Sequence, residues 1–216
     1  MVSERVARKQ EVDKADMLDS FLAHGVAPQE AIFELIITIL GGSDTTSIGI
    51  RSTLLFIITN PRVYYKLQAE IDQSKLFNPN EIISNTEARS LPYLQAVIKE
   101  GLRILPPGTG QMPKVVPQEG ETIHGIFIPG GTNIGINPWY ILRDPVNFGS
   151  DAEIFRPERW LEVEDQKRKG MEYAWELVWG YGKFKCLGHN IAMMEMGKVI
   201  FEVSNSWFVN LIEEYC

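Results

Sequence analysis

Residues Trp179 to Gly188 read WGYGKFKCLG and place one cysteine, Cys186, in a glycine-rich loop directly before an expected helix. Glycine tolerates backbone angles that other residues avoid, so this loop can turn tightly and a flat ligand can approach its backbone closely. The amides at the start of the following helix carry partial positive charge and can hydrogen-bond a sulfur atom. The position therefore favours a thiolate.

A lone thiolate in such a loop has three interpretations. It can act as a nucleophile with His189 as its base, although three residues of separation beside a glycine loop give no assurance of contact. It can be a buried, inert cysteine, an interpretation that the surrounding glycines weaken. It can also ligate haem iron, which leaves the opposite face of the iron open to dioxygen.

Upstream of this loop, a long run of apolar residues predicts a helix over about 28–59, ended by Asn60-Pro61. A helix so long and apolar is expected to run through the middle of a protein, covered on most sides. Gly41-Gly42 lies at its centre, either as a packing notch for a neighbouring helix or as a widened groove beside a ligand.

Two polar residues, Asp44 and Thr45, follow these glycines within the apolar stretch. A buried carboxylate and hydroxyl there need hydrogen-bond partners, because an unpaired buried polar group is costly. One interpretation is a pair that carries protons into an apolar pocket. The simpler one is a polar pair that caps a break in the helix at Gly41-Gly42.

The rest of the pattern predicts a mainly α fold with a minor β part. Further helices are expected over 61–74, about 92–105 and about 190–208. The segments ETIHGIFI and TNIGIN, separated by Pro129-Gly130-Gly131, predict a β-hairpin with a glycine turn.

Composition narrows the classes of function. The chain has 216 residues, a net charge of −7, 44% apolar residues and 23% charged residues, which is ordinary for a soluble globular chain. Its acidic balance argues against nucleic acid as a partner. The two cysteines exclude a disulfide scaffold, and no HExxH or CxxC spacing indicates zinc.

No membrane anchor is expected in this chain. The most apolar run, Ala31 to Leu40, has ten residues and contains Glu34, whereas a membrane span needs about 20 apolar residues. Extending the run to Ile58 brings in Asp44 and Arg51, and each of these charges is costly in lipid.

Four motifs, in the expected order, resemble those of the cytochrome P-450 haem-thiolate monooxygenases. GGSDTT, over 41–46, resembles the oxygen-activation motif on the family's central helix. KEGLR, with Glu100 and Arg103, resembles its ExxR motif, and FRPERW, with Arg159, resembles the segment that completes a cluster with that motif.

The fourth motif is the cysteine loop itself, over 179–188. The family pattern of an aromatic residue, a glycine, the ligand cysteine and a further glycine is matched by Trp179, Gly182, Cys186 and Gly188. The resemblance covers nearly all of the chain and is closest in style to fungal, pisatin-demethylase-like members. It implies a cytochrome P-450-like fold that is incomplete, with the family's N-terminal half and final hairpin missing.

The resemblance implies a role for each matched residue. Cys186 is expected to be the axial ligand of haem iron, with Trp179 and Gly182 also contacting the cofactor. Phe184 stands where the family commonly has a basic residue, so Lys183 or Lys114 is expected to pair with a haem propionate instead.

The other motifs are expected to support the chemistry of the haem. The resemblance implies that Asp44 and Thr45 deliver protons during oxygen activation. It also implies that Glu100, Arg103 and Arg159 form a buried cluster that positions the cysteine loop and takes no direct part in catalysis. Without the resemblance, Glu100 and Arg103 could equally form a surface ion pair, since residues three apart share a helix face.

The expected function is insertion of one atom of dioxygen into a small organic substrate, in fungal secondary metabolism or detoxification. Electrons are expected from NADPH through a separate reductase, because the chain has no dinucleotide-binding fingerprint. A full-length relative is expected at the endoplasmic reticulum membrane. The alternative is a truncated, non-catalytic remnant or a haem-binding module.

Overall fold

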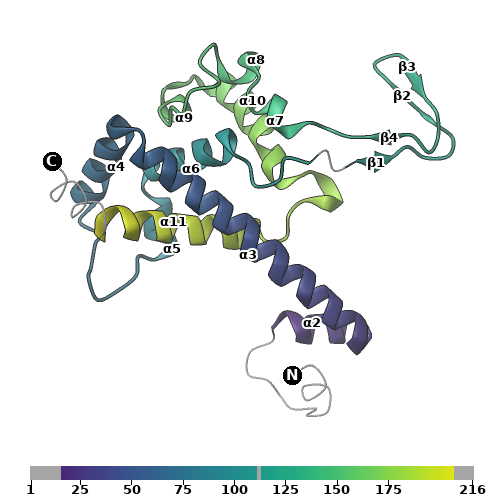
Figure 1. Cartoon of the computed structure of the whole chain (residues 1–216), viewed down its shortest axis with the longest axis horizontal. Helices are drawn as coiled ribbons and strands as arrows, with labels where there is room; N and C mark the ends of the chain where they lie inside the picture. The colour runs from purple at the N-terminus through teal and green to yellow at the C-terminus, as the bar shows by residue number, and fades with distance from the viewer. Residues whose placement is uncertain (1–15, 111–112, 207–216) are drawn as a thin grey trace. The chain divides into compact units, whose positions relative to one another are not determined.

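The computed structural model describes residues 16–110 and 113–206 of the chain. The chain forms two compact units, Met1–Thr45 and Thr46–Cys216. Within the described residues, the second unit holds all of the strands and most of the helices (Figure 1). The mainly α character with a minor β part agrees with the sequence-based expectation.

The described chain begins with α2 (Met17–Ala23), followed by α3 (Pro28–Ile58), which crosses the boundary between the two units. The remaining α-helices are α4 (Pro61–Ser74), α5 (Asn85–Arg89), α6 (Pro92–Ile104), α7 (Pro138–Ile141), α8 (Pro145–Phe148), α9 (Arg159–Glu162), α10 (Asp165–Trp175) and α11 (His189–Ser206). The last two residues of the helix expected over about 190–208 lie outside the described residues.

The first unit leaves most of its long helix uncovered. Phe33 and Ile37 on α3 are 67% and 63% exposed. The expectation of a helix covered on most sides is therefore wrong for this half of α3. The physical reason is that only α2, with seven residues, accompanies it among the described residues of this unit, and so short a helix cannot bury a long apolar face.

Gly41 and Gly42 neither break α3 nor serve as a packing notch. The helix continues through both glycines, and a Cβ atom added at either would meet nothing within 4 Å. Close helix packing occurs elsewhere, at Gly101 of α6, where an added Cβ would lie 2.1 Å from the Thr53 hydroxyl oxygen on α3. The small residue that permits close approach is thus on the partner helix.

The core of the second unit is built around α6. Ten of its 13 residues are buried. It packs against α4, α5, α9 and α11, and the 46–58 part of α3 contributes the fully buried Thr53 and Ile57. An apolar stripe alone does not explain so much burial, since α6 also carries the buried charges of Glu100 and Arg103.

A carboxylate from another helix caps the start of α6. Pro92 occupies the first position of the helix, and the preceding residue, Leu91, supplies no side-chain cap. Glu70 on α4 accepts the amide of Tyr93 through Oε1 at 2.7 Å and the amide of Leu94 through Oε2 at 2.8 Å. Two amides that would otherwise lack an intrahelical partner are thereby satisfied by a negative charge at the positive end of the helix dipole.

Glu70→Ala is expected to lower the free energy of unfolding by about 1–2 kcal/mol, because it removes this cap. Gln73→Ala is the matched control, since Gln73 is an exposed residue of the same helix, and it is expected to change stability by less than about 0.5 kcal/mol. Urea denaturation followed by circular dichroism measures both. Equal effects of the two substitutions would contradict the capping role.

The strands form two separate antiparallel pairs. β1 (Lys114–Val115) pairs with β4 (Asn133–Ile134), and β2 (Glu121–Ile123) pairs with β3 (Ile126–Ile128). The expected hairpin turn at Pro129-Gly130-Gly131 is therefore wrong. The tight turn is at His124 and Gly125, whose φ angles of 50° and 80° are those of a two-residue hairpin turn with both central residues left-handed.

By length and composition, α3 is the one helix among the described residues that could cross a membrane. A core helix of a soluble protein passes the same test. The 46–58 part of α3 is packed in the protein core, where Thr53 and Ile57 are fully buried. We therefore retain the interpretation of this part as a core helix.

Candidate functional site

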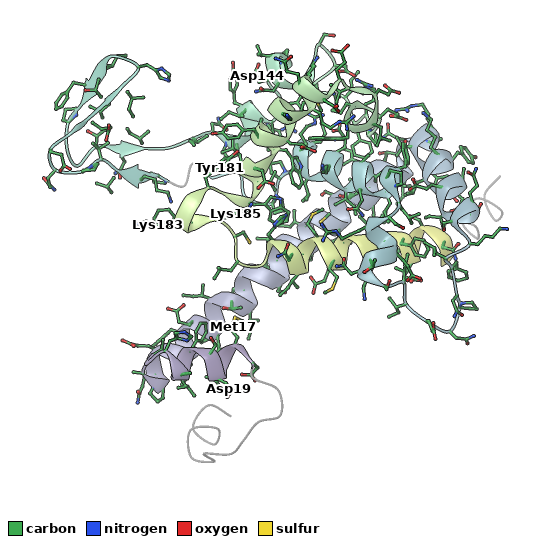
Figure 2. All side chains as sticks on the ribbon, turned by 180° about the vertical axis from the view of Figure 1, so that it is seen from behind. Met17, Asp19, Asp144, Tyr181, Lys183 and Lys185 are labelled. Atoms are coloured by element: carbon green, nitrogen blue, oxygen red, sulfur yellow. The ribbon has the colours of Figure 1, made fainter. Side chains whose placement is uncertain are left out.

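The cysteine loop is a tight turn between two short 3₁₀ helices and α11. Trp179 ends the first of these, η1 (Glu176–Trp179), and Gly182 opens the second, η2 (Gly182–Phe184). The Cys186 amide donates to the Trp179 carbonyl oxygen at 2.7 Å and closes the turn. Figure 2 labels Tyr181, Lys183 and Lys185 on this loop.

Glycine is required where the turn is tightest. Gly180 has a φ of 74°, and a Cβ there would lie 3.0 Å from the Phe184 carbonyl oxygen. Gly182 has a φ of 60°. These left-handed conformations disfavour other residues, and the resulting turn leaves the Cys186 thiol exposed three residues before α11. The inert, buried cysteine considered from the sequence does not describe this geometry.

Two lysines meet at one aromatic ring beside the cysteine. The Nζ atom of Lys114, on β1, lies 3.5 Å from the centroid of the Phe184 ring, and the Nζ atom of Lys183 lies 5.0 Å from it. Both distances are within the range of cation–π attraction. The structure thus brings together the two residues that the sequence offered as separate candidates for binding a carboxylate group.

A row of tryptophans leads to the cysteine loop, a feature that the sequence interpretation missed. The ring centroids of Trp160 and Trp175 are 6.3 Å apart, those of Trp175 and Trp179 are 6.1 Å apart, and that of His189 is 4.4 Å from Trp179. The spacing of four residues between Trp175 and Trp179 was a signal for one of these contacts. The Trp160 contact joins distant segments and left no such signal.

His189 is packed against tryptophan, and its only described ring contact is with Trp179. Burial lowers the pKa of His189; the charge of Glu176 raises this pKa, and the charge of Lys185 lowers it further. The described hydrogen bonds do not include one between His189 and Cys186. This geometry does not favour the interpretation of a cysteine nucleophile with a histidine base.

Glu100, Arg103 and Arg159 form one buried cluster. Arg103 donates to both carboxylate oxygens of Glu100, at 2.9 and 2.8 Å, and the Arg159 Nε atom donates to Glu100 Oε1 at 2.8 Å. None of the three side chains is more than 2% exposed. The alternative of a surface ion pair is therefore excluded.

The two arginines of this cluster also hold the irregular chain around 142–154. Arg103 donates to the carbonyl oxygens of Leu142 and Ala152, at 2.7 and 2.6 Å. Arg159 donates to the carbonyl oxygens of Asp151 and Ile154, at 2.8 and 2.9 Å. Outside the short helix α8, this segment is irregular, and the guanidinium groups supply donors to its carbonyl oxygens.

A second buried carboxylate, Glu158, lies next to Arg159 in the chain and was also missed. Its Oε1 atom accepts hydrogen bonds from Arg62, from Lys66 at 2.7 Å and from the Tyr93 hydroxyl at 3.0 Å. Burial alone would raise the pKa of Glu158, but the bonds from Lys66, its own backbone, Tyr93 and Arg62 outweigh burial and lower the pKa from 4.5 to about 2. Burial and the Glu158 charge in turn raise the pKa of Tyr93.

Glu158→Gln is expected to lower the free energy of unfolding at neutral pH by roughly 2 kcal/mol. The folded-state pKa of Glu158 is depressed, so its stabilisation is present above its ordinary pKa of 4.5 and is lost as the pH falls toward about 2. The difference between wild type and variant should therefore shrink on acidification. Urea titrations over that range measure it.

Glu162→Gln is the control for this prediction, because Glu162 is an exposed carboxylate of the adjoining helix α9 and pairs with Arg156. It is expected to change stability by less than about 1 kcal/mol. A wild-type-to-Glu158→Gln difference that stays constant with pH would contradict the assigned charge state.

Asp44 and Thr45 are on α3 but are not buried. Both side chains are exposed, and the Thr45 hydroxyl donates to the Gly41 carbonyl oxygen one turn earlier. The expectation of a buried acid–alcohol pair is therefore wrong for this structure, as is that of a cap at a helix break, because α3 is continuous here. The physical reason is the missing cover over this half of α3.

Comparison with known proteins identifies the family. The family model described as Cytochrome P-450 matches residues 1–203, and the chain belongs to the cytochrome P-450 family. It is 46% identical over 203 residues to the cytochrome P-450 monooxygenase aba1 of Botryotinia fuckeliana, covering 92% of this chain and 39% of that protein.

Two further relatives support the same family assignment. The cytochrome P-450 monooxygenase abl1 of Leptosphaeria maculans is 43% identical over 212 residues, covering 94% of this chain and 37% of that protein. A pisatin demethylase of Fusarium vanettenii is 40% identical over 187 residues, covering 86% of this chain and 35% of that protein. The chain thus spans less than two fifths of the length of these relatives.

Proposed function

We propose that the protein is a haem-thiolate monooxygenase in which the Cys186 thiolate would hold the haem iron. The observation that carries the proposal is the exposed thiol at the end of a turn closed by the hydrogen bond from Cys186 to Trp179. When bound, the haem supplies the activation of dioxygen. Membership of the cytochrome P-450 family supports this cofactor.

The described residues fit such a group. An exposed thiol offers one ligand to iron. Lys114 and Lys183 converge on Phe184 and offer two cations to the carboxylates of a porphyrin. Phe184 and Leu187 are exposed apolar side chains next to the thiol, 57% and 100% exposed, and both can cover a porphyrin ring. Among the described residues no cluster of three or more His, Cys, Asp or Glu side chains is arranged to hold a metal ion.

We assign the buried Glu100 cluster a supporting role. It holds the 142–154 segment through the two arginines, and Trp160, which donates to Glu100 at 2.9 Å, continues this framework toward the tryptophan row. No group of the cluster is exposed to a substrate. Its function is to fix the geometry of the chain that precedes the cysteine loop.

Asp44 and Thr45 are proposed to move protons in the complete active site. The Thr45 hydroxyl has its donor held by the Gly41 carbonyl oxygen and its lone pairs free to accept. To pass a proton on, the hydroxyl turns its O–H away from the Gly41 carbonyl oxygen, which cannot take the proton itself, while one of its lone pairs receives a proton from the donor. The family motif GGSDTT supports the assignment.

The substrate is proposed to be a small organic molecule, with electrons supplied from NADPH by a separate reductase and the protein at the endoplasmic reticulum membrane. The relatives named a monooxygenase and a pisatin demethylase support a role in fungal secondary metabolism or detoxification. The alternative is a non-catalytic haem-binding module. Such a module would show a thiolate-type haem spectrum but would form no product.

Cys186→Ala, in the protein expressed from its natural gene, is expected to abolish the thiolate-type Soret band of the reduced, carbon monoxide-bound haem, because the sulfur ligand is lost. Cys216→Ala supplies the matched control and is expected to retain the band. Difference spectroscopy measures both. A band that persists in Cys186→Ala would remove this residue as the iron ligand.

Thr45→Ala is expected to keep the haem spectrum but to lower the product formed per NADPH oxidised by about tenfold or more, with peroxide released instead. Thr38→Ala is the matched control, since Thr38 is an exposed threonine of α3 whose hydroxyl likewise donates to the carbonyl one turn earlier, that of Glu34, at 2.8 Å. An unchanged coupling ratio in Thr45→Ala would exclude the proton role.

A further inference from the structure

Three tryptophans in the row beside the cysteine loop differ in how their indole N–H groups are used. Trp160 donates to Glu100 Oε2 at 2.9 Å, and Trp175 donates to the Lys99 carbonyl oxygen at 2.9 Å. The Trp179 Nε1 atom is buried and has no hydrogen-bond partner among the described residues. A buried donor without an acceptor is unfavourable, so Trp179 is the member of the row whose N–H group is still available to a further acceptor.

The surroundings of Trp179 narrow the identity of that acceptor. The side chain is only 8% exposed, which leaves bulk water little access. A cavity of about 310 Å³ adjoins Trp175 and His189, but Trp179 is not among its lining residues. The Trp179 ring therefore does not line that cavity.

Trp179 contacts the residues on both sides of the thiol, through its main chain and through its ring. Its carbonyl oxygen accepts the Cys186 amide at 2.7 Å, and its ring packs against His189, the first residue of α11. Trp179 is thus bound on the main-chain side to the cysteine itself and on the ring side to the helix that follows the cysteine. Phenylalanine would fill the same place without adding an unpaired donor.

From these observations we propose that the indole N–H of Trp179 donates a hydrogen bond to the Cys186 thiolate when this sulfur ligates haem iron. The inference rests on the proposed haem-thiolate function. Trp179 is then a positioning residue that acts on the iron through the sulfur. A hydrogen bond to a ligating thiolate withdraws charge from it, weakens its donation to the metal and raises the reduction potential.

The test is Trp179→Phe in the holoprotein, which keeps an aromatic ring and removes the N–H. The iron–sulfur stretching frequency, measured by resonance Raman spectroscopy, is expected to rise and the ferric/ferrous reduction potential to fall. Trp175→Phe is the matched control, because it removes an indole N–H of the same row that already has an acceptor. It is expected to leave both quantities unchanged and to lower stability instead.

A second measurement uses hydrogen–deuterium exchange. In the wild-type holoprotein, exchange into D₂O is expected to shift the iron–sulfur stretch, since the donor becomes N–D, and Trp179→Phe is expected to abolish that part of the shift. Unchanged frequency and potential in Trp179→Phe would overturn the inference, as would equal changes in Trp175→Phe. A wild-type protein without a Cys186-dependent thiolate band would instead refute the proposed function, and the inference with it.

Discussion

The carboxylate of Glu100 is the group on which the second unit of the structure depends. It is fully buried and accepts hydrogen bonds from the side chains of Arg103, Arg159 and Trp160 and from the backbone amide of Arg156. A buried charge is tolerated only when its hydrogen bonds are complete. That requirement ties α6 to α9 and fixes both arginines, whose remaining N–H groups then hold the 142–154 chain. The Glu100 carboxylate on α6 thus orders the 142–154 segment indirectly, through the two arginines that it binds.

Much of the fold could be predicted from local signals in the sequence. The proline-started helices α4 and α6 and the turn of glycines before α11 follow from residues close together in the chain. The predicted position of the hairpin turn was wrong because Pro129-Gly130-Gly131 is the stronger turn signal. His124 has a left-handed φ of 50°, which histidine adopts too rarely for the sequence to predict it. Contacts between distant segments, such as those of Glu158 with Lys66 and Tyr93, leave no pattern in a single sequence.

The candidate site residues also divide into those predictable from local sequence and those that depend on contacts between distant segments. Glu100 and Arg103 are three residues apart, so their pairing is a matter of helix geometry, whereas the meeting of Lys114 and Lys183 at Phe184 joins a strand to a distant loop. The exposure of Asp44 and Thr45 could not be read from an apolar helix, because burial depends on what packs against a helix as much as on its own residues. Asp44 and Thr45 are candidates because of the sequence motif, and the fold alone does not place them in a pocket.

Glu158 and Arg159 are neighbours in the chain, but their side chains have different partners. Glu158 accepts hydrogen bonds from α4 and from Tyr93. Arg159 donates to Glu100 and to carbonyl oxygens within 148–154. An insertion or deletion of one residue between them would force one of two charged side chains to give up its buried partners. A change of length around 156–160 is therefore expected to destabilise the second unit. The short link between α9 and α10, at 163–164, makes no described ion pair, so a change in chain length is expected to be tolerated better there than within either helix.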